Sequence, residues 1–560
     1  MRVHRTRPLL LAFLVCSLAA TAAAQSKGAK LISADSMEPH LRFLGAKEFR
    51  GRSAPSTELD IASRYIALEA ARLGLKPLMP DGSYFQPVPV EVTTVSPSRS
   101  YLRVIGAGAE TRFSFPQAFT TPIRTGGEWA VAGGVVFVGS AFVGSPPKWD
   151  EAWSVDLQGK IAVMLEGPPR TPTGGTPAQT AAAGLAARTR LLREKGAVGL
   201  VTVISREREA VLRERGLDFD VTERLRFLDV DTVNPAPPRP AGQAAGQPTA
   251  STPPVAAAAP FYVVDVRHEA GAAILGVSPD ELARLFVALA GNQAVPPHTV
   301  EGKSMEVAVF LDQRRKTTPN VLAVLPGSDP VLKDEYVVIG SHHDHNPPRE
   351  GRVFPGADDN ASGCVAMLEI ARAMMVERPK RSVIFVWHTA EERGLIGAYY
   401  FVQHSPVPVE RITANLNLDM ITRNDPNGIY LIGSNKISSE LDKSFQDMNR
   451  AGVTLTLDYK YEDPGEPNRF FFRSDHYPYM RYGIPGVWIF CGTTPDYHQE
   501  GDVEEKADYA KMEKVTRLTY LVAMDVGNKP ALLKLDLHPE ITARGAHNMK
   551  VVWQRPPQPR

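Results

Sequence analysis

The chain has 560 residues, of which 63 are Lys or Arg and 62 are Asp or Glu, so its formal net charge is +1 at pH 7. This length exceeds what one ordinary hydrophobic core holds, and it predicts two or more domains. A hydrophobic share of 43% and a charged share of 22% are typical of a globular protein. The near-zero net charge gives no reason to expect nucleic acid or a charged membrane surface as the main partner.

Residues 1–24 have the pattern of a secretory signal peptide. Basic residues up to Arg7 precede an apolar run from Leu9 to Ala20, and small residues before Gln25 offer a cleavage site. The run is too short for a membrane-spanning helix, which needs about 20 apolar residues. We therefore expect an exported protein, periplasmic or extracellular in a bacterium, with no stable membrane insertion after cleavage.

Two cysteines, Cys364 and Cys491, would remain in the exported chain, because Cys16 lies in the signal peptide. Two cysteines do not make a disulfide framework. Whether they form one bridge or stay as buried free thiols is left open by the sequence.

The segment 25–112 begins with a helical pattern between Met37 and Gly74. Its apolar residues recur at three- and four-residue steps, which predicts one amphipathic helix packing through Ile61, Tyr65, Leu68 and Ala71. Strand-like segments follow this helix.

Between residues 113 and 297 the sequence changes to short apolar strands separated by Gly- and Pro-rich loops. This pattern predicts a separate α+β domain inserted into the rest of the chain. Residues 234–260 form a Pro/Ala/Gln/Thr tract with almost no large apolar side chains, and we expect it to be a disordered loop.

From residue 298 to about 530, strand and helix patterns alternate. The alternation predicts an α/β domain with a mostly parallel mixed sheet between two layers of helices. The predicted strands include Val337–Ile339, Val383–Trp387, Asn415–Asp419 and Val487–Phe490. The tail 531–560 is uninformative.

Polar side chains follow the ends of these four strands. They are His342, the pair Glu391 and Glu392, Asp419 and, a few residues past the last strand, His498. Ligands of open α/β sheets bind at the carboxyl ends of the strands, so these side chains are expected to lie close together. Asp359 stands in the loop before the helix that begins near Ala361, and we expect it to join them.

Two histidines and three carboxylates exceed what one tetrahedral zinc ion requires. They suit two ions about 3.5–4 Å apart with one bridging carboxylate. Only one side chain of the pair Glu391 and Glu392 needs to be a ligand, which leaves the other as a general base.

Six motifs, in this order, resemble the zinc-dependent exopeptidases that include bacterial leucyl aminopeptidases and glutamate carboxypeptidase II. The resemblance covers roughly residues 35–110 and 300–527. The motifs are His342-His343-Asp344, Gly356-Ala357-Asp358-Asp359-Asn360-Ala361-Ser362-Gly363, Ala390-Glu391-Glu392-Arg393-Gly394-Leu395-Ile396-Gly397, Asn417-Leu418-Asp419-Met420, Ser474-Asp475-His476 and Tyr497-His498.

The resemblance implies roles for individual residues. It implies two Zn²⁺ per chain, with Glu391 as general base, Asp344 orienting a ligand imidazole and Tyr497 as a donor to the oxyanion. The implied metal ligands are His342, Asp359, Glu392, Asp419 and His498, with Asp359 bridging the ions.

The inserted segment 113–297 resembles a protease-associated domain. The best matching pieces are Gly159-Lys160-Ile161-Ala162-Val163 and Lys195-Gly196-Ala197-Val198-Gly199-Leu200-Val201. Such a domain would border the cleft of the enzyme.

Other polar residues near these motifs are given ordinary structural roles. His343 and His345 match no ligand position, so a nonligand role is favoured for both. Asp358 and Asn360 are expected to shape their loop and cap the following helix. Ser474-Asp475-His476 lacks the Gly-x-Ser-x-Gly elbow of a hydrolase triad and is interpreted as a pocket wall or a support for a ligand.

The predicted function is hydrolysis of peptide bonds at chain ends, with an aminopeptidase favoured over a carboxypeptidase or dipeptidase. The sequence also leaves open a glutaminyl cyclase and a noncatalytic, receptor-like relative. Glutaminyl cyclases share the fold with a single zinc, and a receptor-like relative would keep the fold without the chemistry. Side-chain preference and oligomeric state are not determined by the sequence.

Overall fold

The computed structural model describes residues 26–106, 108–123, 127–140, 155–167, 185–221, 223–229, 261–291, 293, 295–463 and 466–537. The predicted signal peptide, the predicted disordered loop 234–260 and the tail beyond residue 537 lie outside the described residues. Within the described residues, no helix is long and apolar enough to cross a membrane.

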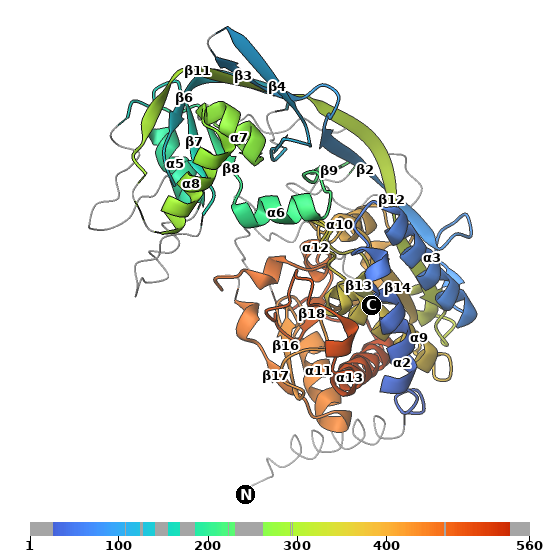
Figure 1. The fold of residues 1–560 in the computed structure, drawn as a ribbon. Coiled ribbons are helices and arrows are strands. Elements are labelled where there is room, and N and C mark those ends of the chain that lie inside the picture. The colour runs from blue at the N-terminus through green and yellow to red at the C-terminus, as the bar shows by residue number, and fades with distance from the viewer. Residues whose placement is uncertain are drawn as a thin grey trace, which may run out of the picture.

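Two sheets organise the described part of the chain, and Figure 1 shows them as two bodies joined by long strands. In the first sheet the strand order is β17-β16-β18-β15-β13-β14-β12-β2-β9, with β1 also paired to β12. Its strands are β1 (Lys76–Pro77), β2 (Phe85–Val95), β9 (Glu223–Phe227), β12 (Leu311–Leu325), β13 (Tyr336–His342), β14 (Ser382–His388), β15 (Ile412–Leu418), β16 (Gly428–Ile432), β17 (Thr456–Asp458) and β18 (Gly486–Phe490).

The first sheet is mixed, and it matches the predicted mostly parallel sheet only at its centre and in the pair β16 and β17 at one edge. Strands β14, β13, β15 and β18 run parallel to their neighbours in this group. The long strand β12 pairs antiparallel with both β14 and β2, and β16 pairs antiparallel with β18. The parallel centre matters for function because its strands all end at the same edge.

Helices cover both faces of this sheet, as the alternating pattern predicts. Val337 and Ile339 of β13 face a core shared with α2, α3, α9, α11 and α13, whereas Val338 faces a core shared with α10 and α12. The helices are α2 (Ala34–Leu44), α3 (Thr57–Arg72), α9 (Ser362–Met374), α10 (Ile396–Gln403), α11 (Ser439–Gly452), α12 (His476–Arg481) and α13 (Tyr509–Asn528).

The single amphipathic helix predicted between Met37 and Gly74 is wrong in two respects. The segment forms two helices, α2 and α3, and Ser56 caps the second by accepting a hydrogen bond from the backbone of Leu59. Two residues of the predicted apolar face point to solvent, since Ile61 is 50% and Leu68 is 57% exposed. The buried face consists of Leu59, Ala62, Ser63, Ile66, Ala67 and Ala70. The small residues of this face allow α3 to lie close to the core. The periodicity of large apolar side chains does not reveal such a face.

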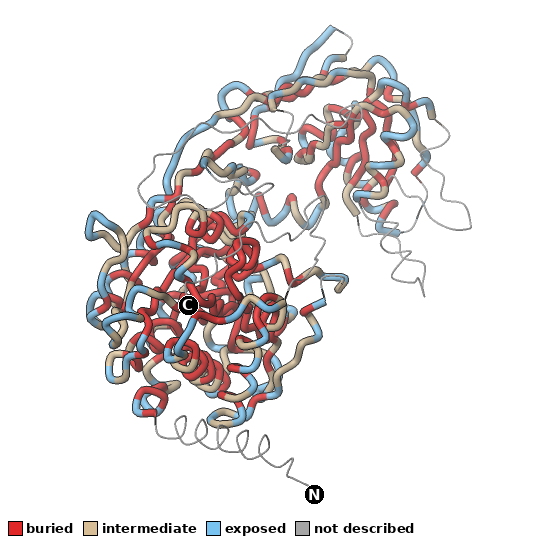
Figure 2. Tube along the Cα trace, turned by 180° about the vertical axis from the view of Figure 1, so that it is seen from behind, coloured by how far each residue is buried: buried red, intermediate tan, exposed pale blue. Residues whose placement is uncertain are grey.

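The second sheet has the strand order β4-β3-β11-β6-β7-β8-β10-β5 and its own hydrophobic core. Figure 2 shows buried chain concentrated in this body as well as in the first. Its strands are β3 (Tyr101–Gly106), β4 (Ala109–Ser114), β5 (Phe119–Thr120), β6 (Trp129–Phe137), β7 (Ile161–Leu165), β8 (Gly199–Val203), β10 (Tyr262–Val266) and β11 (His298–Val309), and its helices are α5 (Leu185–Glu194), α6 (Arg206–Glu214), α7 (His268–Leu275) and α8 (Pro279–Ala290).

The second sheet extends beyond the predicted limits 113–297 at both ends. Strand β3 and strand β11 pair with each other outside that range, and β11 also pairs with β6. In the opposite sense, β9 lies within the range but pairs with β2 of the first sheet. The sequence pattern does not reveal these pairings because they join segments far apart in the chain.

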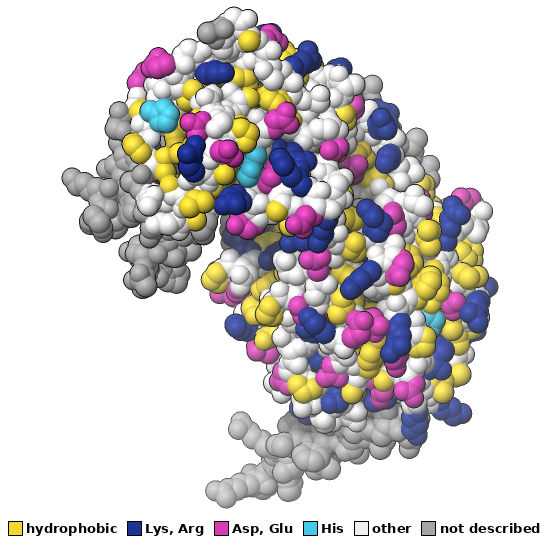
Figure 3. Space-filling view, in the orientation of Figure 1, with side chains coloured by type: hydrophobic (Ala, Val, Ile, Leu, Met, Phe, Trp, Pro, Cys, Tyr) yellow, Lys and Arg dark blue, Asp and Glu magenta, His cyan; other side chains and the backbone are white. Residues whose placement is uncertain are grey.

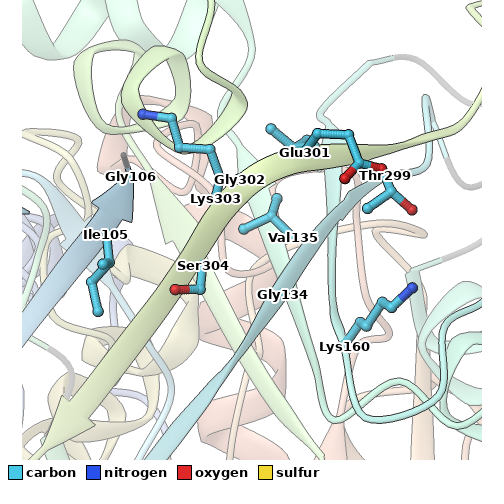
Figure 4. Close-up of a pocket in the computed structure, with 11 residues that line it drawn as sticks. Ile105, Gly106, Gly134, Val135, Lys160, Thr299, Glu301, Gly302, Lys303 and Ser304 are labelled. Carbon is cyan, nitrogen blue, oxygen red and sulfur yellow. The ribbon is translucent and has the colours of Figure 1, made fainter. Parts of the chain in front are cut away.

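Both sheets carry mixed surface charge on the face shown in Figure 3, where basic and acidic side chains are interspersed. A pocket opens on the second sheet, between β3, β6 and β11. Figure 4 shows Lys160 and Lys303 on opposite sides of this pocket. None of the predicted metal ligands lines it.

Candidate metal centre

The predicted site residues meet at the carboxyl edge of the parallel strands. His342 ends β13, and Asp419 directly follows β15. The Nε2 atom of His342 lies 3.3 Å from Oδ1 of Asp419 and 3.3 Å from Oδ1 of Asp359. These three buried residues form the first group of donor atoms.

A second group forms around the other oxygen of Asp359. The Nε2 atom of His498 lies 3.1 Å from Oδ2 of Asp359 and 3.2 Å from Oε1 of Glu392. Asp359 therefore faces the first group with one carboxylate oxygen and the second group with the other. All five residues predicted as ligands are thus brought together.

His345 belongs to the second group, although the sequence favoured a nonligand role for it. Its Nδ1 atom lies 2.8 Å from Oε1 of Glu392 and 3.8 Å from Oδ2 of Asp359. The imidazole is completely buried. The one sequence signal that could have found it is its position three residues after His342 in the same segment.

The donor set fits divalent metal ions of the zinc type. One ligand atom from each of His345, Asp359, Glu392 and His498 lies within 4.8 Å of the others, and the same holds for His342, Asp359 and Asp419. Two ligands of one tetrahedral zinc ion are separated by about 3.3 Å, given bonds of about 2.0–2.1 Å. Buried polar atoms also remain without hydrogen bonds here, namely both ring nitrogens of His345 and Oε1 of Glu392.

Strong electrostatic coupling connects these residues. Burial alone would raise the pKa of Glu392, but the imidazoles of His345 and His498 outweigh it and bring this pKa to about 2. Burial would likewise lower the pKa of His498, but Asp359 and Glu392 raise it to about 10. In the metal-free protein the imidazole of His498, which lies between carboxylates, therefore binds a proton, and a metal cation that binds there would displace this proton.

The loop that carries Asp359 is fixed by buried hydrogen bonds. Asp502 accepts the backbone N–H groups of Asp358 and Asp359 at 2.9 and 3.0 Å. The side chain of Asn360 accepts from the backbone N–H of Gly363, in the first turn of α9, at 3.0 Å. The position of Asp359 is thus determined before any ion binds.

Arg52 is a second support of the site, and the sequence did not suggest it. Its guanidinium is buried and donates to the backbone carbonyls of His343 and Gly356 at 3.0 and 2.9 Å. It also donates to the carbonyls of Leu44 and Pro355. One side chain thereby connects the segment after β13 to the loop before α9.

Glu391 stands beside the first group. Its Oε2 atom lies 4.0 Å from Nε2 of His342. Burial raises the pKa of Glu391 well above its ordinary value, even though the nearby His342 acts in the opposite sense. A carboxylate with a raised pKa next to a metal position has the properties of a general base.

Asp344 contacts both Glu391 and His342, but not as predicted. Its carboxylate Oδ1 accepts the backbone N–H of Glu391 at 3.0 Å. The Nδ1 atom of His342 contacts the backbone carbonyl of Asp344 at 3.1 Å, whereas the carboxylate is 3.8 Å away. Burial raises the pKa of Asp344 to about 7.

Tyr497 lies against the second group. Its ring stacks on that of His498, with 3.8 Å between the ring centroids. Its hydroxyl accepts a hydrogen bond from Nη2 of Arg473 at 3.0 Å, and burial raises its pKa. The hydroxyl therefore keeps its proton and can donate it.

Ser474 supports Asp419 and is not part of a hydrolase triad in the described structure. Its hydroxyl donates to Oδ2 of Asp419 at 2.5 Å and accepts from Nδ2 of Asn417 at 2.8 Å. Neither ring nitrogen of His476 forms a hydrogen bond within the described residues. This agrees with the interpretation of Ser474 as a support for a ligand.

Residues 320–523 match the family model described as Peptidase family M28. These residues make up a little over a third of the chain and are called the M28 segment. The M28 segment contains every residue of the two donor groups, together with Glu391 and Tyr497. Arg52 and every strand of the second sheet lie outside it.

Relatives of the M28 segment are found among curated proteins. The probable leucine aminopeptidase 2 of Aspergillus oryzae is 32% identical over 202 residues, which cover 34% of this chain and 38% of that protein. The leucine aminopeptidase 2 of Trichophyton equinum is 28% identical over 198 residues, covering 34% and 36%. The chain thus spans little more than a third of the length of these relatives.

Solved structures also match the chain. A zinc aminopeptidase from Bacillus subtilis has a TM-score of 0.49 and 17% identity, covering 93% of this chain and 99% of that one. An aminopeptidase from Aneurinibacillus sp. strain AM-1 has a TM-score of 0.47 and 21% identity, covering 91% and 97%.

Proposed function

We propose that the chain is an exported zinc-dependent exopeptidase that binds two Zn²⁺ ions and acts as an aminopeptidase on peptides or proteins. The observation that carries the proposal is the meeting of two donor groups at Asp359, with Glu391 beside them. The M28 match and the names of the curated relatives support peptide hydrolysis as the reaction.

Each group in the site has a role in this reaction. The ions would polarise the scissile carbonyl and lower the pKa of a water molecule. Glu391 takes a proton from that water and later gives it to the leaving amine. Tyr497 donates its hydroxyl proton in a hydrogen bond to the oxyanion of the tetrahedral intermediate.

The walls of the pocket suit an apolar substrate side chain. The pocket at the metal centre is lined by Asp359, Glu391 and Asp419 and also by Phe470, Trp488 and Phe490. Aromatic walls favour large apolar groups through burial of surface. We therefore expect N-terminal residues such as leucine or phenylalanine to be preferred.

The body built on the second sheet is proposed to be a protease-associated domain that borders the pocket. Its helix α6 contacts the loop that leads from His345 to Gly356. Arg208 of α6 donates to Glu350 at 2.6 Å, and Asp220 accepts the backbone N–H of Glu350 at 2.7 Å.

Hydrolysis of a small panel tests the proposed function. Aminoacyl anilides are compared with N-blocked peptides that end in Glu or Asp, first with zinc and then after treatment with a chelator. Chelator-sensitive cleavage of the anilides alone is the expected result. Cleavage of the blocked peptides alone would show a carboxypeptidase, and cleavage of neither would contradict the exopeptidase proposal.

The same preparation distinguishes a glutaminyl cyclase and a noncatalytic relative from the proposed enzyme. Zinc content of two ions per chain is expected, whereas a glutaminyl cyclase would hold one ion and cyclise N-terminal glutamine. A noncatalytic relative would hold zinc weakly or not at all and would cleave nothing in the panel.

A further inference from the structure

His345 is a buried imidazole whose ring nitrogens form no hydrogen bonds within the described structure. An unsatisfied buried polar group is costly and calls for an explanation. Its Nδ1 atom lies 2.8 Å from Oε1 of Glu392, yet neither of these buried atoms is counted in a hydrogen bond within the described residues. Two metal-ligating atoms have this arrangement when both point toward the position of one ion and not toward each other.

The neighbouring His498 approaches the same point from another direction. Its ring is inclined by 74° to that of His345, with the ring centroids 5.5 Å apart. Both imidazoles converge on Oε1 of Glu392, at 2.8 Å for His345 and 3.2 Å for His498. The second group thus offers two imidazoles and two carboxylates, whereas the first offers one imidazole and two carboxylates.

The orientation of His345 is imposed by its surroundings. Its backbone N–H donates to the carbonyl of Arg52 at 3.4 Å. Its ring packs on Gly356, where a Cβ atom would lie 2.6 Å from Cγ of His345. Gly356 has φ of +65°, a conformation that also favours glycine. Arg52 binds the carbonyl of Gly356. The imidazole is therefore held toward Glu392 from both sides.

We propose that Nδ1 of His345 is a fourth protein ligand of the metal position formed by Asp359, Glu392 and His498. This inference rests on the proposed two-metal function and deepens it. This position then has four protein ligands, whereas the position formed by His342, Asp359 and Asp419 has three. Asp359 is a ligand of both positions. The position with His345 fills first and keeps its ion when the other ion is removed.

The test counts imidazoles around the tightly bound ion. Metal-free protein is loaded with one equivalent of Zn²⁺, and X-ray absorption at the zinc edge gives the number of imidazole ligands. Two are expected in the wild type and one in the His345→Ala variant. A single imidazole in both proteins would overturn the inference and would leave His345 as a group that only positions Glu392.

Metal titration supplies a second readout that does not depend on activity. Stepwise addition of Co²⁺ to the wild type should show two binding steps, with the first at least ten times tighter than the second. The variants His345→Ala and His345→Asn should each weaken the first step at least tenfold. Equal first-step affinity in the wild type and both variants would contradict the proposal.

His343→Gln is a matched control, since His343 is equally buried and lies two residues away. Its ring nitrogens contact Ser63 and the carbonyl of His388 instead of the donor groups. Circular dichroism of all variants checks that they are folded. Failure of the exopeptidase proposal would appear separately, as a wild type that binds no metal or cleaves no substrate.

Discussion

The carboxylate of Asp344 accepts a hydrogen bond from the backbone N–H of Glu391, with 3.0 Å between Oδ1 and N. Asp344 follows the end of β13 and Glu391 follows the end of β14, so this bond joins the loops of two neighbouring strands. It places the proposed base beside the first donor group. Nδ1 of His342 lies 3.8 Å from this carboxylate but only 3.1 Å from the backbone carbonyl oxygen of Asp344.

Replacing Asp344 tests this positioning role. In Asp344→Asn the amide oxygen can still accept from Glu391, so kcat should change little. Asp344→Ala removes the acceptor and should lower kcat by about 10–100-fold, the range found when supports of metal sites are lost. Steady-state kinetics with zinc analysis decide the matter, and equal losses in both variants would contradict a role through this hydrogen bond.

Glu391→Gln should abolish most of the turnover while leaving the zinc content unchanged. The amide keeps the size of the side chain but cannot accept a proton, and general-base catalysis typically contributes about 10²–10⁴-fold. Glu392→Gln is the matched comparison, since it should reduce the metal content. Turnover equal to that of the wild type in Glu391→Gln would show that Glu391 is not the general base.

Tyr497→Phe should lower kcat by about 10²–10³-fold with a smaller effect on KM, because the hydroxyl acts on charge that develops in the transition state. Tyr461→Phe is a suitable control, since Tyr461 packs on Phe470 of the same aromatic wall without contacting the donor groups. A change in KM alone for Tyr497→Phe would point to substrate binding instead of oxyanion stabilisation.

Acid sensitivity of folding should arise in part from His476. Burial lowers the pKa of His476 from the ordinary 6.5 to about 3, so the native state keeps this ring neutral while the unfolded chain binds a proton. The free energy of unfolding is therefore unaffected by this histidine above pH 6.5. As the pH falls from 6.5 toward 3, the histidine lowers the free energy of unfolding by about 1.4 kcal/mol per pH unit.

Urea unfolding of the metal-free protein between pH 7.5 and 5 measures this effect. His476→Phe should flatten the fall in stability, because phenylalanine suits a site beside Phe471 and Trp488. The exposed His298 provides the control variant His298→Phe, which should behave as the wild type. An equally steep fall in His476→Phe would show that His476 makes no contribution.

Arg52→Met should destabilise the fold and loosen the metal centre together. The change removes the Arg52 donor from four buried carbonyl oxygens, of which, within the described residues, only that of Gly356 keeps another donor, the backbone N–H of Ala361, and it should cost about 3 kcal/mol or more. Arg42→Met removes only the ion pairs of an exposed arginine with Glu38 and Glu504 and should cost less than about 1 kcal/mol. Thermal unfolding and zinc affinity of the two variants provide the comparison.

The sequence alone predicted the meeting of His342, Glu392, Asp419 and His498, because each follows a strand of the parallel centre. Parallel strands end at one edge, so the order of elements is enough to place such residues together. Near-continuous apolar runs marked these strands, since both of their faces are buried. The helices on both faces followed from the same alternation.

Only the tertiary structure decided which further residues complete the site. His345 lies in a loop whose path depends on Arg52, a residue nearly 300 positions earlier in the chain, through the backbone bond between the two. Asp502 reaches the backbone of Asp358 and Asp359 from a segment 144 and 143 residues later in the chain. Local patterns of hydrophobicity carry no information about such contacts, because the contacts join segments whose proximity arises only when the sheet and its helices have packed.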